Sequence, residues 1–325
     1  MKTLLVTGGC GFIGSHFIKG FLKSHPEWNI RNLDKLTYSG NRENIRELEG
    51  RKNYEFVQGD IADPRVVRQA VQNAEAVIHF AAETHVDRSI DDDSQFLLTN
   101  VIGTRNLLEA ARQKGVQRFL HISTDEVYGS IESGVAAEEA PLRPNSPYSA
   151  SKAGADLLVR AYVKTYGFRA TIARSTNNFG PYQFPEKVIP LFATNLLEGK
   201  KVPLYGGGGN RRDWIYVEDN CRALELIFEK GEPGAIYNIG AGNEMTNREL
   251  TRAILRLMHQ PEKMIQPVED RPGHDFRYAV DSSRIRGLGF KPQWTLEQAL
   301  RHTLDWYEKN ADWWRPLKQD RYTIK

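Results

Sequence analysis

Strand-like and helix-like segments alternate along much of this chain, and that alternation limits the fold more than any other feature. Short apolar or β-branched runs predict strands at 3–7, 29–34, 54–60, 76–82, 118–124, 170–177 and 235–240. Apolar residues at near-helical spacing predict helices over 96–113 and 148–166. Strands and helices that alternate in this way form a parallel sheet with helices on both faces. The pattern therefore predicts an α/β fold with a doubly wound parallel sheet.

A glycine-rich turn follows the first predicted strand and opens a helix. Gly8, Gly11 and Gly14 give the spacing G-x-x-G-x-x-G. Glycines let a pyrophosphate approach the backbone at a helix N-terminus, where free N–H groups and the helix dipole favour anions. Asp34 ends the next strand at the offset expected of a carboxylate that binds the adenosine ribose. Because this carboxylate would repel a 2′-phosphate, the sequence favours NAD over NADP, although Lys35 lies beside it.

The alternation loosens beyond residue 177, where glycine- and proline-containing loops become frequent. A chain of 325 residues is long enough for one large α/β domain and a second lobe. We expect residues 1–176 plus 214–240 to form a Rossmann domain that binds the dinucleotide. Residues 177–213 plus 241–325 are expected to form a smaller C-terminal substrate-binding lobe.

Tyr148 and Lys152 are four residues apart in a predicted helix, so they share one face. A lysine ammonium near a phenol lowers the phenol's pKa from its usual value of about 10. The pair therefore predicts Tyr148 as the base that accepts the proton of a substrate hydroxyl. A surface tyrosine and lysine on a helix is the alternative, which the preceding nucleotide-binding pattern disfavours.

Thr124, Asp125 and Glu126 end the strand that precedes this helix. An enzyme that only moves a hydride needs no pair of carboxyl groups. An enzyme that oxidises a carbon, removes a neighbouring proton and expels a hydroxyl needs both an acid and a base. The triplet therefore indicates a dehydratase, against the alternative of an exposed acidic turn or a helix cap.

Motifs along nearly the whole chain resemble the extended short-chain dehydrogenase/reductase family. They are Thr-Gly-Gly-x-Gly-Phe-Ile-Gly at 7–14, Leu-Asp-Lys-Leu-Thr-Tyr-Ser-Gly-Asn at 33–41, Ala-Ala-Glu-Thr-His-Val-Asp-Arg-Ser-Ile at 81–90, Ser-Thr-Asp-Glu-Val-Tyr-Gly at 123–129, Tyr-x-x-x-Lys at 148–152, Asn-Asn-Phe-Gly-Pro-Tyr-Gln-Phe-Pro-Glu-Lys at 177–187, Arg-Arg-Asp-Trp at 211–214 and Asp-Arg-Pro-Gly-His-Asp at 270–275. The acidic pair resembles the nucleotide-sugar 4,6-dehydratases within this family, because the related epimerases usually lack it.

The resemblance implies NAD-dependent dehydration of a nucleotide-diphosphate glucose, with dTDP-glucose as the favoured substrate. The sugar is oxidised at carbon 4, loses water across carbons 5 and 6, and regains hydride at carbon 6. Tyr148 would take the hydroxyl proton, Glu126 the proton at carbon 5, and protonated Asp125 would donate to the departing hydroxyl. The residues assigned to catalysis are Thr124, Asp125, Glu126, Tyr148 and Lys152.

Binding residues are assigned from the same resemblance and from their places at strand ends. Those assigned to NAD are Gly8, Gly11, Phe12, Ile13, Gly14, Asp34, Lys35, Thr37, Asp60, Ile61, Ala81, Ala82, Thr84, Tyr148 and Lys152. Those assigned to the nucleotide sugar are Thr84, Asn177, Glu186, Lys187, Arg212, Asn247, Arg271, His274 and Tyr278. The two arginines in this set, at 212 and 271, are expected to clamp the diphosphate.

Other functions remain open at this point. A UDP-glucose 4,6-dehydratase or a 4-epimerase would use much of the same site, although Asp125 and Glu126 argue against the epimerase. A non-catalytic dinucleotide-binding regulator could share the fold, and the intact pair of Tyr148 and Lys152 argues against it.

Composition sets the remaining expectations. The 44 basic and 41 acidic residues leave a net charge of +3, and the absence of a long basic run argues against a nucleic-acid partner. Cys10 and Cys221 give neither a disulfide framework nor metal-ligand spacing, which favours a reducing cytoplasm and no metal. No apolar run is long enough to span a membrane. By resemblance we expect a homodimer formed through the helices at 97–113 and 148–166, whose apolar faces could equally pack on the sheet.

Overall fold

Seven parallel strands form the main sheet of the protein, for which a computed structural model describes residues 2–270 and 273–319. The strand order is β10-β6-β5-β4-β1-β2-β3. The strands are β1 (Lys2–Thr7), β2 (Trp28–Asp34), β3 (Tyr54–Gln58), β4 (Ala76–His79), β5 (Arg118–Thr124), β6 (Ala170–Ser175) and β10 (Ile236–Ile239). Each coincides with a predicted strand to within a few residues at its ends. The predicted α/β fold with a doubly wound parallel sheet is confirmed.

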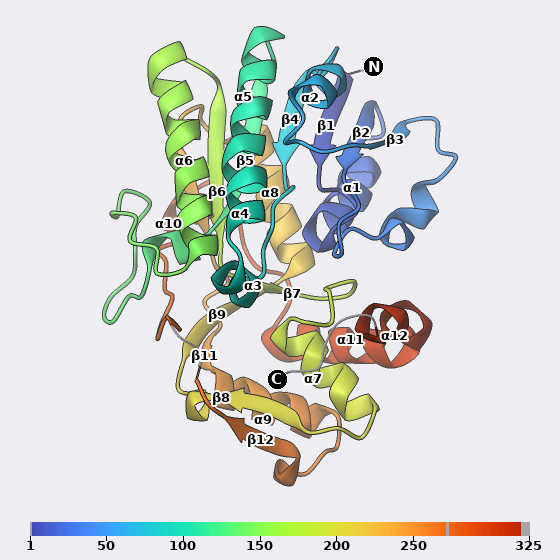
Figure 1. The fold of residues 1–325 in the computed structure, drawn as a ribbon, viewed down its shortest axis with the longest axis vertical. Helices are drawn as coiled ribbons and strands as arrows, with labels where there is room; N and C mark the ends of the chain where they lie inside the picture. Colours follow the sequence, from blue (N-terminus) through green and yellow to red (C-terminus); the bar gives the residue numbers. More distant parts are fainter. Residues whose placement is uncertain (1, 271–272, 320–325) are drawn as a thin grey trace.

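Helices cover both faces of this sheet (Figure 1). One face carries α1 (Phe12–Ser24) and α8 (Val217–Lys230), and the other carries α2 (Pro64–Ala70), α5 (Thr104–Gln113) and α6 (Pro147–Tyr166). Successive residues of β1 serve the two faces in turn, because side chains alternate along a strand. Leu4 and Val6 pack with α1 and α8, whereas Leu5 packs with α2 and α5. Burial on both faces explains why the strands are continuous apolar runs.

The helix predicted over 96–113 is continuous but not uniformly α-helical. It comprises α4 (Ser94–Phe96), a π-helical segment η2 (Leu97–Gly103) and α5. Within η2 the side chain of Asn100 accepts from the Glu83 N–H at 2.9 Å and donates to the Glu83 carbonyl at 3.0 Å. It also donates to Ser151 Oγ at 2.8 Å. The π-helical turn therefore joins the end of the β4 loop to α6, a tertiary role that apolar periodicity does not report.

The helix α6 begins and ends where its sequence specifies. Ser146 and Ser149 form a reciprocal capping box at its N-terminus, with Pro147 at the first helical position. Gly167 ends it in the left-handed conformation, at φ +62°. The helix predicted over 148–166 is confirmed, and its first two turns carry Tyr148 and Lys152.

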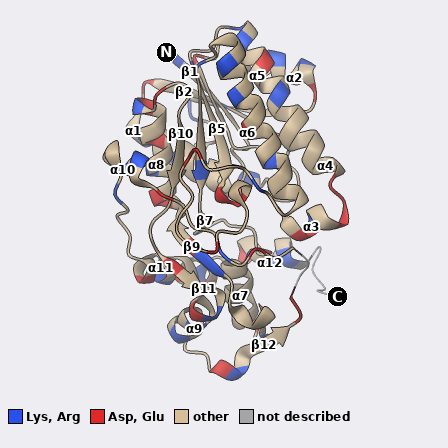
Figure 2. Cartoon of the chain, turned by 90° about the vertical axis from the view of Figure 1, so that its left-hand side faces the viewer, with Lys and Arg blue, Asp and Glu red and all other residues tan. Residues whose placement is uncertain are grey.

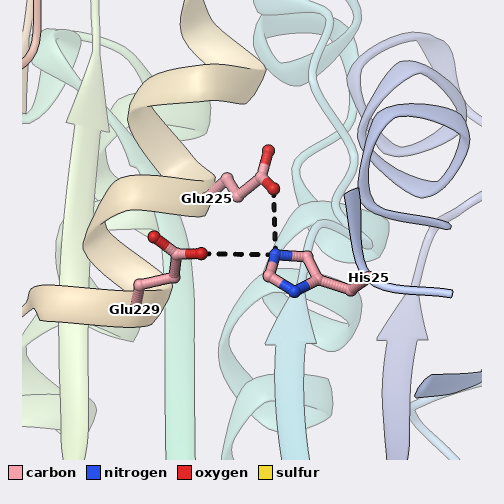
Figure 3. Close-up of side chains that lie close together, drawn as sticks. All are labelled: His25, Glu225 and Glu229. Atoms are coloured by element: carbon pink, nitrogen blue, oxygen red, sulfur yellow. Dashed lines mark hydrogen bonds and ion pairs between the residues drawn. The ribbon is translucent and has the colours of Figure 1, made fainter. Parts of the chain in front are cut away.

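A histidine joins α1 to α8 at the end of the sheet where β2 starts (Figure 3). His25, at the C-terminal cap of α1, places Nε2 3.0 Å from Glu225 Oε1 and 3.3 Å from Glu229 Oε1. The two glutamates lie one turn apart on α8, so both reach the same imidazole. This contact fixes α1 far from its N-terminus, which faces the opposite edge of the sheet.

A smaller group of elements lies below the carboxyl ends of the main strands (Figure 1). It contains a three-stranded sheet, β7 (Asn177–Phe179), β9 (Arg211–Tyr216) and β11 (Glu244–Thr246), and a parallel pair, β8 (Val202–Tyr205) and β12 (Ile265–Val268). Its helices include α7 (Val188–Leu197), α9 (Asn247–Leu257), α11 (Leu296–Lys309) and α12 (Ala311–Gln319). Between β9 and β11 the chain returns to the large sheet as α8 and β10.

Short elements complete the described chain: α3 (Val86–Asp91), α10 (Ser283–Gly287) and the 3-10 turns η1 (Arg42–Leu48), η3 (Asp125–Tyr128), η4 (Gly206–Gly208) and η5 (Glu262–Met264). Basic and acidic residues are interspersed over the outer helices (Figure 2). Among the described residues, no helix combines the length and apolarity needed to cross a membrane.

Candidate active site

A pocket of about 310 Å³ lies at the carboxyl ends of the main strands. Its lining comes from the ends of β1, β2, β4, β5 and β6, from the first turns of α1 and α6, and from the segment after β7. The strand order reverses between β1 and β4, which are neighbours in the sheet. Ligands of open α/β sheets bind in the crevice at such a point.

The nucleotide end of the pocket is built from backbone. Gly8 has φ +73°, and a Cβ there would lie 2.6 Å from the Ala81 nitrogen. A Cβ on Gly14 would lie 2.4 Å from the Gly8 oxygen. Only glycine fits these positions, and the turn leads directly into α1, whose N-cap is Gly11. The cradle therefore fits the pyrophosphate of a dinucleotide held at a helix N-terminus.

Asp34 provides the carboxylate at this end. Its Oδ2 accepts the Cys10 N–H at 2.9 Å and its Oδ1 accepts the Leu36 N–H at 2.8 Å. Burial raises its pKa, against these hydrogen bonds. Lys35 Nζ lies 2.7 Å from Asp60 Oδ2, so the neighbouring ammonium is occupied by a carboxylate rather than presented to a 2′-phosphate. The arrangement fits NAD.

Three consecutive residues define the other end of the pocket. Thr124 ends β5, and its Oγ1 accepts the Glu126 N–H at 3.3 Å and donates to Asp125 Oδ1 at 3.2 Å. Asp125 is 3% exposed. Burial, and then the charge of Glu126, raise the pKa of Asp125 to about 8, although Arg212 and the hydrogen bond from Thr124 lower it. Asp125 is therefore mainly protonated at neutral pH and can act as an acid.

Tyr148 and Lys152 face this triplet from α6. Lys152 Nζ donates to the Ile122 carbonyl at 2.7 Å, and burial lowers the pKa of Lys152 to about 8. The pKa of Tyr148 is raised, first by burial and then by Glu126, against the hydrogen bond with Thr124. The predicted net lowering of the Tyr148 pKa is wrong. The ammonium is bound to a backbone carbonyl, and desolvation of the phenol is the larger effect.

All residues assigned to catalysis or to NAD line this one pocket. Of those assigned to the nucleotide sugar, Thr84, Asn177, Glu186 and Lys187 line it, whereas Arg212, Asn247, His274 and Tyr278 are not in its lining. Arg271 lies outside the described residues.

Arg212 and Tyr278 nevertheless lie next to the catalytic end. The Arg212 guanidinium stacks 4.1 Å from the Tyr278 ring centroid and donates to the Asp275 carbonyl at 2.8 Å. The Tyr278 hydroxyl donates to Asp275 Oδ2 at 2.7 Å and is 3.5 Å from Glu126 Oε2. Asn247, in contrast, begins α9, and His274 Nδ1 is 2.6 Å from Asp270 Oδ1.

The sequence reasoning missed a group that joins three segments of the pocket. The Tyr38 hydroxyl donates to Glu186 Oε1 at 3.0 Å, and Arg88 Nη2 donates to Glu186 Oε2 at 3.3 Å. The Arg88 guanidinium also lies 3.7 Å from the Tyr38 ring centroid. Both missed residues stand inside the motifs at 33–41 and 81–90, and that membership was the available signal.

Residues 5–303 match the family described as GDP-mannose 4,6 dehydratase. A dTDP-glucose 4,6-dehydratase of Streptomyces niveus is 50% identical over 320 residues, 97% of this chain and 95% of the relative. A solved dTDP-glucose 4,6-dehydratase from Streptomyces venezuelae, with NAD bound, has a TM-score of 0.95 at 50% identity and covers 97% of this chain and 99% of that one. A UDP-glucose 4-epimerase from Thermus thermophilus in complex with NAD has a TM-score of 0.87 at 34% identity, covering 95% and 99%.

The doubly wound sheet and its tyrosine–lysine pocket define the class of extended short-chain dehydrogenases/reductases. More particularly, the chain belongs to the GDP-mannose 4,6 dehydratase family. The resemblance to nucleotide-sugar 4,6-dehydratases predicted from the sequence is confirmed. The relatives from the two Streptomyces species are both named dTDP-glucose 4,6-dehydratase, which acts on the substrate that the sequence favoured.

Proposed function

We propose that this protein is an NAD-dependent dTDP-glucose 4,6-dehydratase, a hydro-lyase of deoxysugar biosynthesis. It converts the sugar to its 4-keto-6-deoxy form. The observation that carries the proposal is a buried, mainly protonated Asp125 next to Glu126 at the end of β5, opposite Tyr148. A plain dehydrogenase or an epimerase has no use for such an acid. The curated and solved relatives with the same activity support it.

Bound NAD supplies reversible hydride transfer, and the cradle at Gly8, Gly11 and Gly14 with Asp34 would hold it. The chain's own residues move the protons. Tyr148 takes the proton of the hydroxyl at carbon 4 as that carbon is oxidised to a ketone. Burial raises the pKa of the Tyr148 phenol, so the phenolate that accepts this proton requires stabilisation by positive charge in the complex with NAD and substrate.

The ketone acidifies the hydrogen at carbon 5, which Glu126 removes as a proton. Asp125 donates its proton to the hydroxyl at carbon 6, which leaves as water, and a double bond forms between carbons 5 and 6. Hydride addition to carbon 6 and a proton from Glu126 to carbon 5 complete the product. Thr124 orients this step, because its hydroxyl donates to the Asp125 carboxyl group and accepts the backbone N–H of Glu126.

The nucleotide sugar is proposed to bind between the large sheet and the lower lobe. Residues 1–176 plus 214–240 would hold NAD, and residues 177–213 plus 241–325 would hold the nucleotide sugar. Asn177, Glu186 and Lys187 support this because they line the pocket on its lobe side. Arg212 would reach the diphosphate only after exchanging hydrogen bonds, since its guanidinium donates to backbone carbonyls in this structure.

A homodimer is part of the proposal. Leu97, Leu98 and Ile102 on η2 are 48%, 39% and 47% exposed, and Leu157 on α6 is 52% exposed. The two helices pack closely at Gly154, where a Cβ would lie 3.5 Å from Val101. Large apolar side chains gathered on neighbouring helices fit a self-complementary interface. Light scattering that gives the mass of one 37.0 kDa chain would contradict the dimer.

The cytoplasm is the proposed compartment. Cys10 and Cys221 are both buried and unpaired, which suits a reducing environment. Cell fractionation tests this, because recovery of the protein outside the cytoplasmic fraction would contradict it.

The decisive experiment follows hydrogen isotopes through one turnover of purified protein with NAD. Substrate deuterated at carbon 4 is expected to give product deuterated at carbon 6. Ordinary substrate in heavy water is expected to gain one deuterium at carbon 5. Label that washes from carbon 4 into solvent would indicate a plain dehydrogenase, and a galactose product would indicate an epimerase. A parallel assay with UDP-glucose and UDP-N-acetylglucosamine identifies the preferred nucleotide.

A further inference from the structure

A tryptophan of the last described helix is linked through one asparagine to the glycine-rich turn at the nucleotide end of the pocket. Trp313, on α12, donates its indole Nε1–H to Asn44 Oδ1 at 2.9 Å. Asn44 lies in η1, on the other part of the molecule, and is 1% exposed. Its Nδ2–H donates to the carbonyl of Cys10 at 2.9 Å, inside the glycine-rich turn. A continuous path of hydrogen bonds therefore runs from α12 to the cradle.

Hydrogen bonds hold both the N–H and the carbonyl group of Cys10, the residue at the end of this path. The Cys10 carbonyl accepts from Asn44 and from the Asn41 N–H at 3.0 Å, while the Cys10 N–H donates to Asp34 Oδ2 at 2.9 Å. Peptide planarity passes the orientation of the Cys10 carbonyl to Gly11, the N-cap of α1. The first turn of α1 then presents its free N–H groups in a fixed direction.

The Trp313 indole and the Cys10 carbonyl together set the orientation of the Asn44 amide. An asparagine side chain has an acceptor on one side and donors on the other. With Oδ1 toward the indole and Nδ2 toward the Cys10 carbonyl, both hydrogen bonds form. The reversed amide would set donor against donor and acceptor against acceptor. Because Asn44 is almost fully shielded from solvent, that conflict would be costly.

The indole is held in place independently of this hydrogen bond. Its ring centroid lies 5.1 Å from that of Trp306 and 5.6 Å from that of Tyr182. Tyr182 in turn carries Lys19 Nζ 4.4 Å from its ring centroid, which joins the cluster to α1. A phenylalanine at 313 keeps an aromatic ring in this cluster and removes only the N–H donor.

We propose that Trp313 is a positioning residue for NAD, acting through Asn44 on the Cys10 peptide and so on the cradle at the N-terminus of α1. The inference rests on the proposed NAD binding and extends it to a residue outside the pocket. The lower lobe thereby takes part in holding the cofactor as well as the nucleotide sugar.

A matched pair of variants tests the proposal. Trp313→Phe should weaken the binding of NAD about tenfold, because the buried Oδ1 of Asn44 loses its donor and the amide loses one of the two contacts that orient it. Trp314→Phe is the control, because Trp314 is the next residue of α12 and its Nε1–H donates to the Tyr307 carbonyl of α11 at 2.7 Å rather than to Asn44. Calorimetric titration with NAD and, separately, with dTDP, together with melting temperatures without ligand, gives the readouts.

The expected result is a loss of NAD affinity in Trp313→Phe alone, with dTDP affinity unchanged. Equal NAD affinities in the two variants, or a parallel loss for NAD and dTDP, would overturn the proposal. In an Asn44→Leu background the same substitution at 313 should have no further effect on NAD affinity, and an additive effect would also overturn it. Wild-type protein that binds no NAD would instead refute the proposed function.

Discussion

The two ends of the pocket are built from different materials. At the nucleotide end, Gly8 and Gly14 bring main chain against main chain, and the Asp34 carboxylate is held by backbone N–H groups. At the catalytic end, Asp125 and Tyr148 are buried side chains. Burial and the charge of Glu126 raise the pKa values of both groups. The first end is therefore sensitive to shape and the second to charge. One parallel sheet supplies both, because its strands end at a common edge.

The largest effect is expected from removing a proton acceptor at the charge-sensitive end. Tyr148→Phe should lower turnover by about 10²–10⁴-fold while NAD affinity stays near wild type, because general acid–base groups contribute that much and the cradle is untouched. Steady-state kinetics and NAD titration measure the two quantities. Tyr166→Phe, on the exposed end of the same helix, should leave both unchanged. Turnover within a few-fold of wild type would remove Tyr148 from the mechanism.

A methyl group should break the shape-sensitive end. Gly14→Ala is expected to weaken NAD binding about tenfold or more, since its Cβ would lie 2.4 Å from the Gly8 oxygen and the turn must open. Titration with NAD measures the loss. Gly20→Ala, on the same helix with nothing within 4 Å of the added Cβ, should keep NAD affinity and stabilise the helix by about 1 kcal/mol. Similar NAD affinities in both variants would contradict the role of the cradle.

The smallest expected effect is a change of thermal stability with pH, which should arise at the charge-sensitive end and not at the shape-sensitive end. The pKa of Asp125 is raised from 3.8 to about 8 in the folded protein, so folding favours its protonated form. That contribution is present below the unfolded pKa and is lost as pH rises through about 8. Asp125→Asn cannot ionise, so its melting temperature relative to wild type should rise by a few degrees between about pH 4 and pH 8.

Thermal unfolding across this pH range, without ligands, measures the difference. The Gly14→Ala variant serves as the comparison, because its offset from wild type should not change with pH. A constant offset for Asp125→Asn would show that the carboxyl group is ionised in the folded protein, and Asp125 would then be unsuited to act as the acid.

The large sheet was predictable because its signals are local. Leu4, Leu5 and Val6 form an apolar run that is buried on both faces, and the glycine turn after it is read within a few residues. The lower lobe was not predictable in the same detail. Strand β9 begins with two arginines and an aspartate, which are not typical strand residues. The hydrogen-bond partners that hold them in a strand are distant in the sequence. Arg212 donates to carbonyls of the 275–276 segment, and Asp213 accepts N–H groups of Gly242 and Asn243.

The site shows the same limit. The identities of Tyr148 and Lys152 followed from their spacing, but the direction of the Tyr148 pKa shift did not, because burial and the approach of Glu126 exist only in the folded chain. The π-helical turn around Asn100 was missed for a related reason, since its hydrogen bonds to the loop after β4 are contacts between residues far apart in the sequence. Local patterns name the reacting groups, whereas tertiary contacts set their protonation.

The position of β10 has a consequence for how the chain is made. This strand pairs with β6, from Ile236 opposite Ile172 to Ile239 opposite Ser175. The ribosome synthesises β6 long before β10. Until residue 239 has emerged, β6 is therefore an unpaired edge strand, although all its residues are buried in the folded protein. A fragment cut after residue 176 would keep every glycine of the cradle and still expose that edge to other chains. Shortened versions of this protein therefore need α8 and β10 to remain monodisperse.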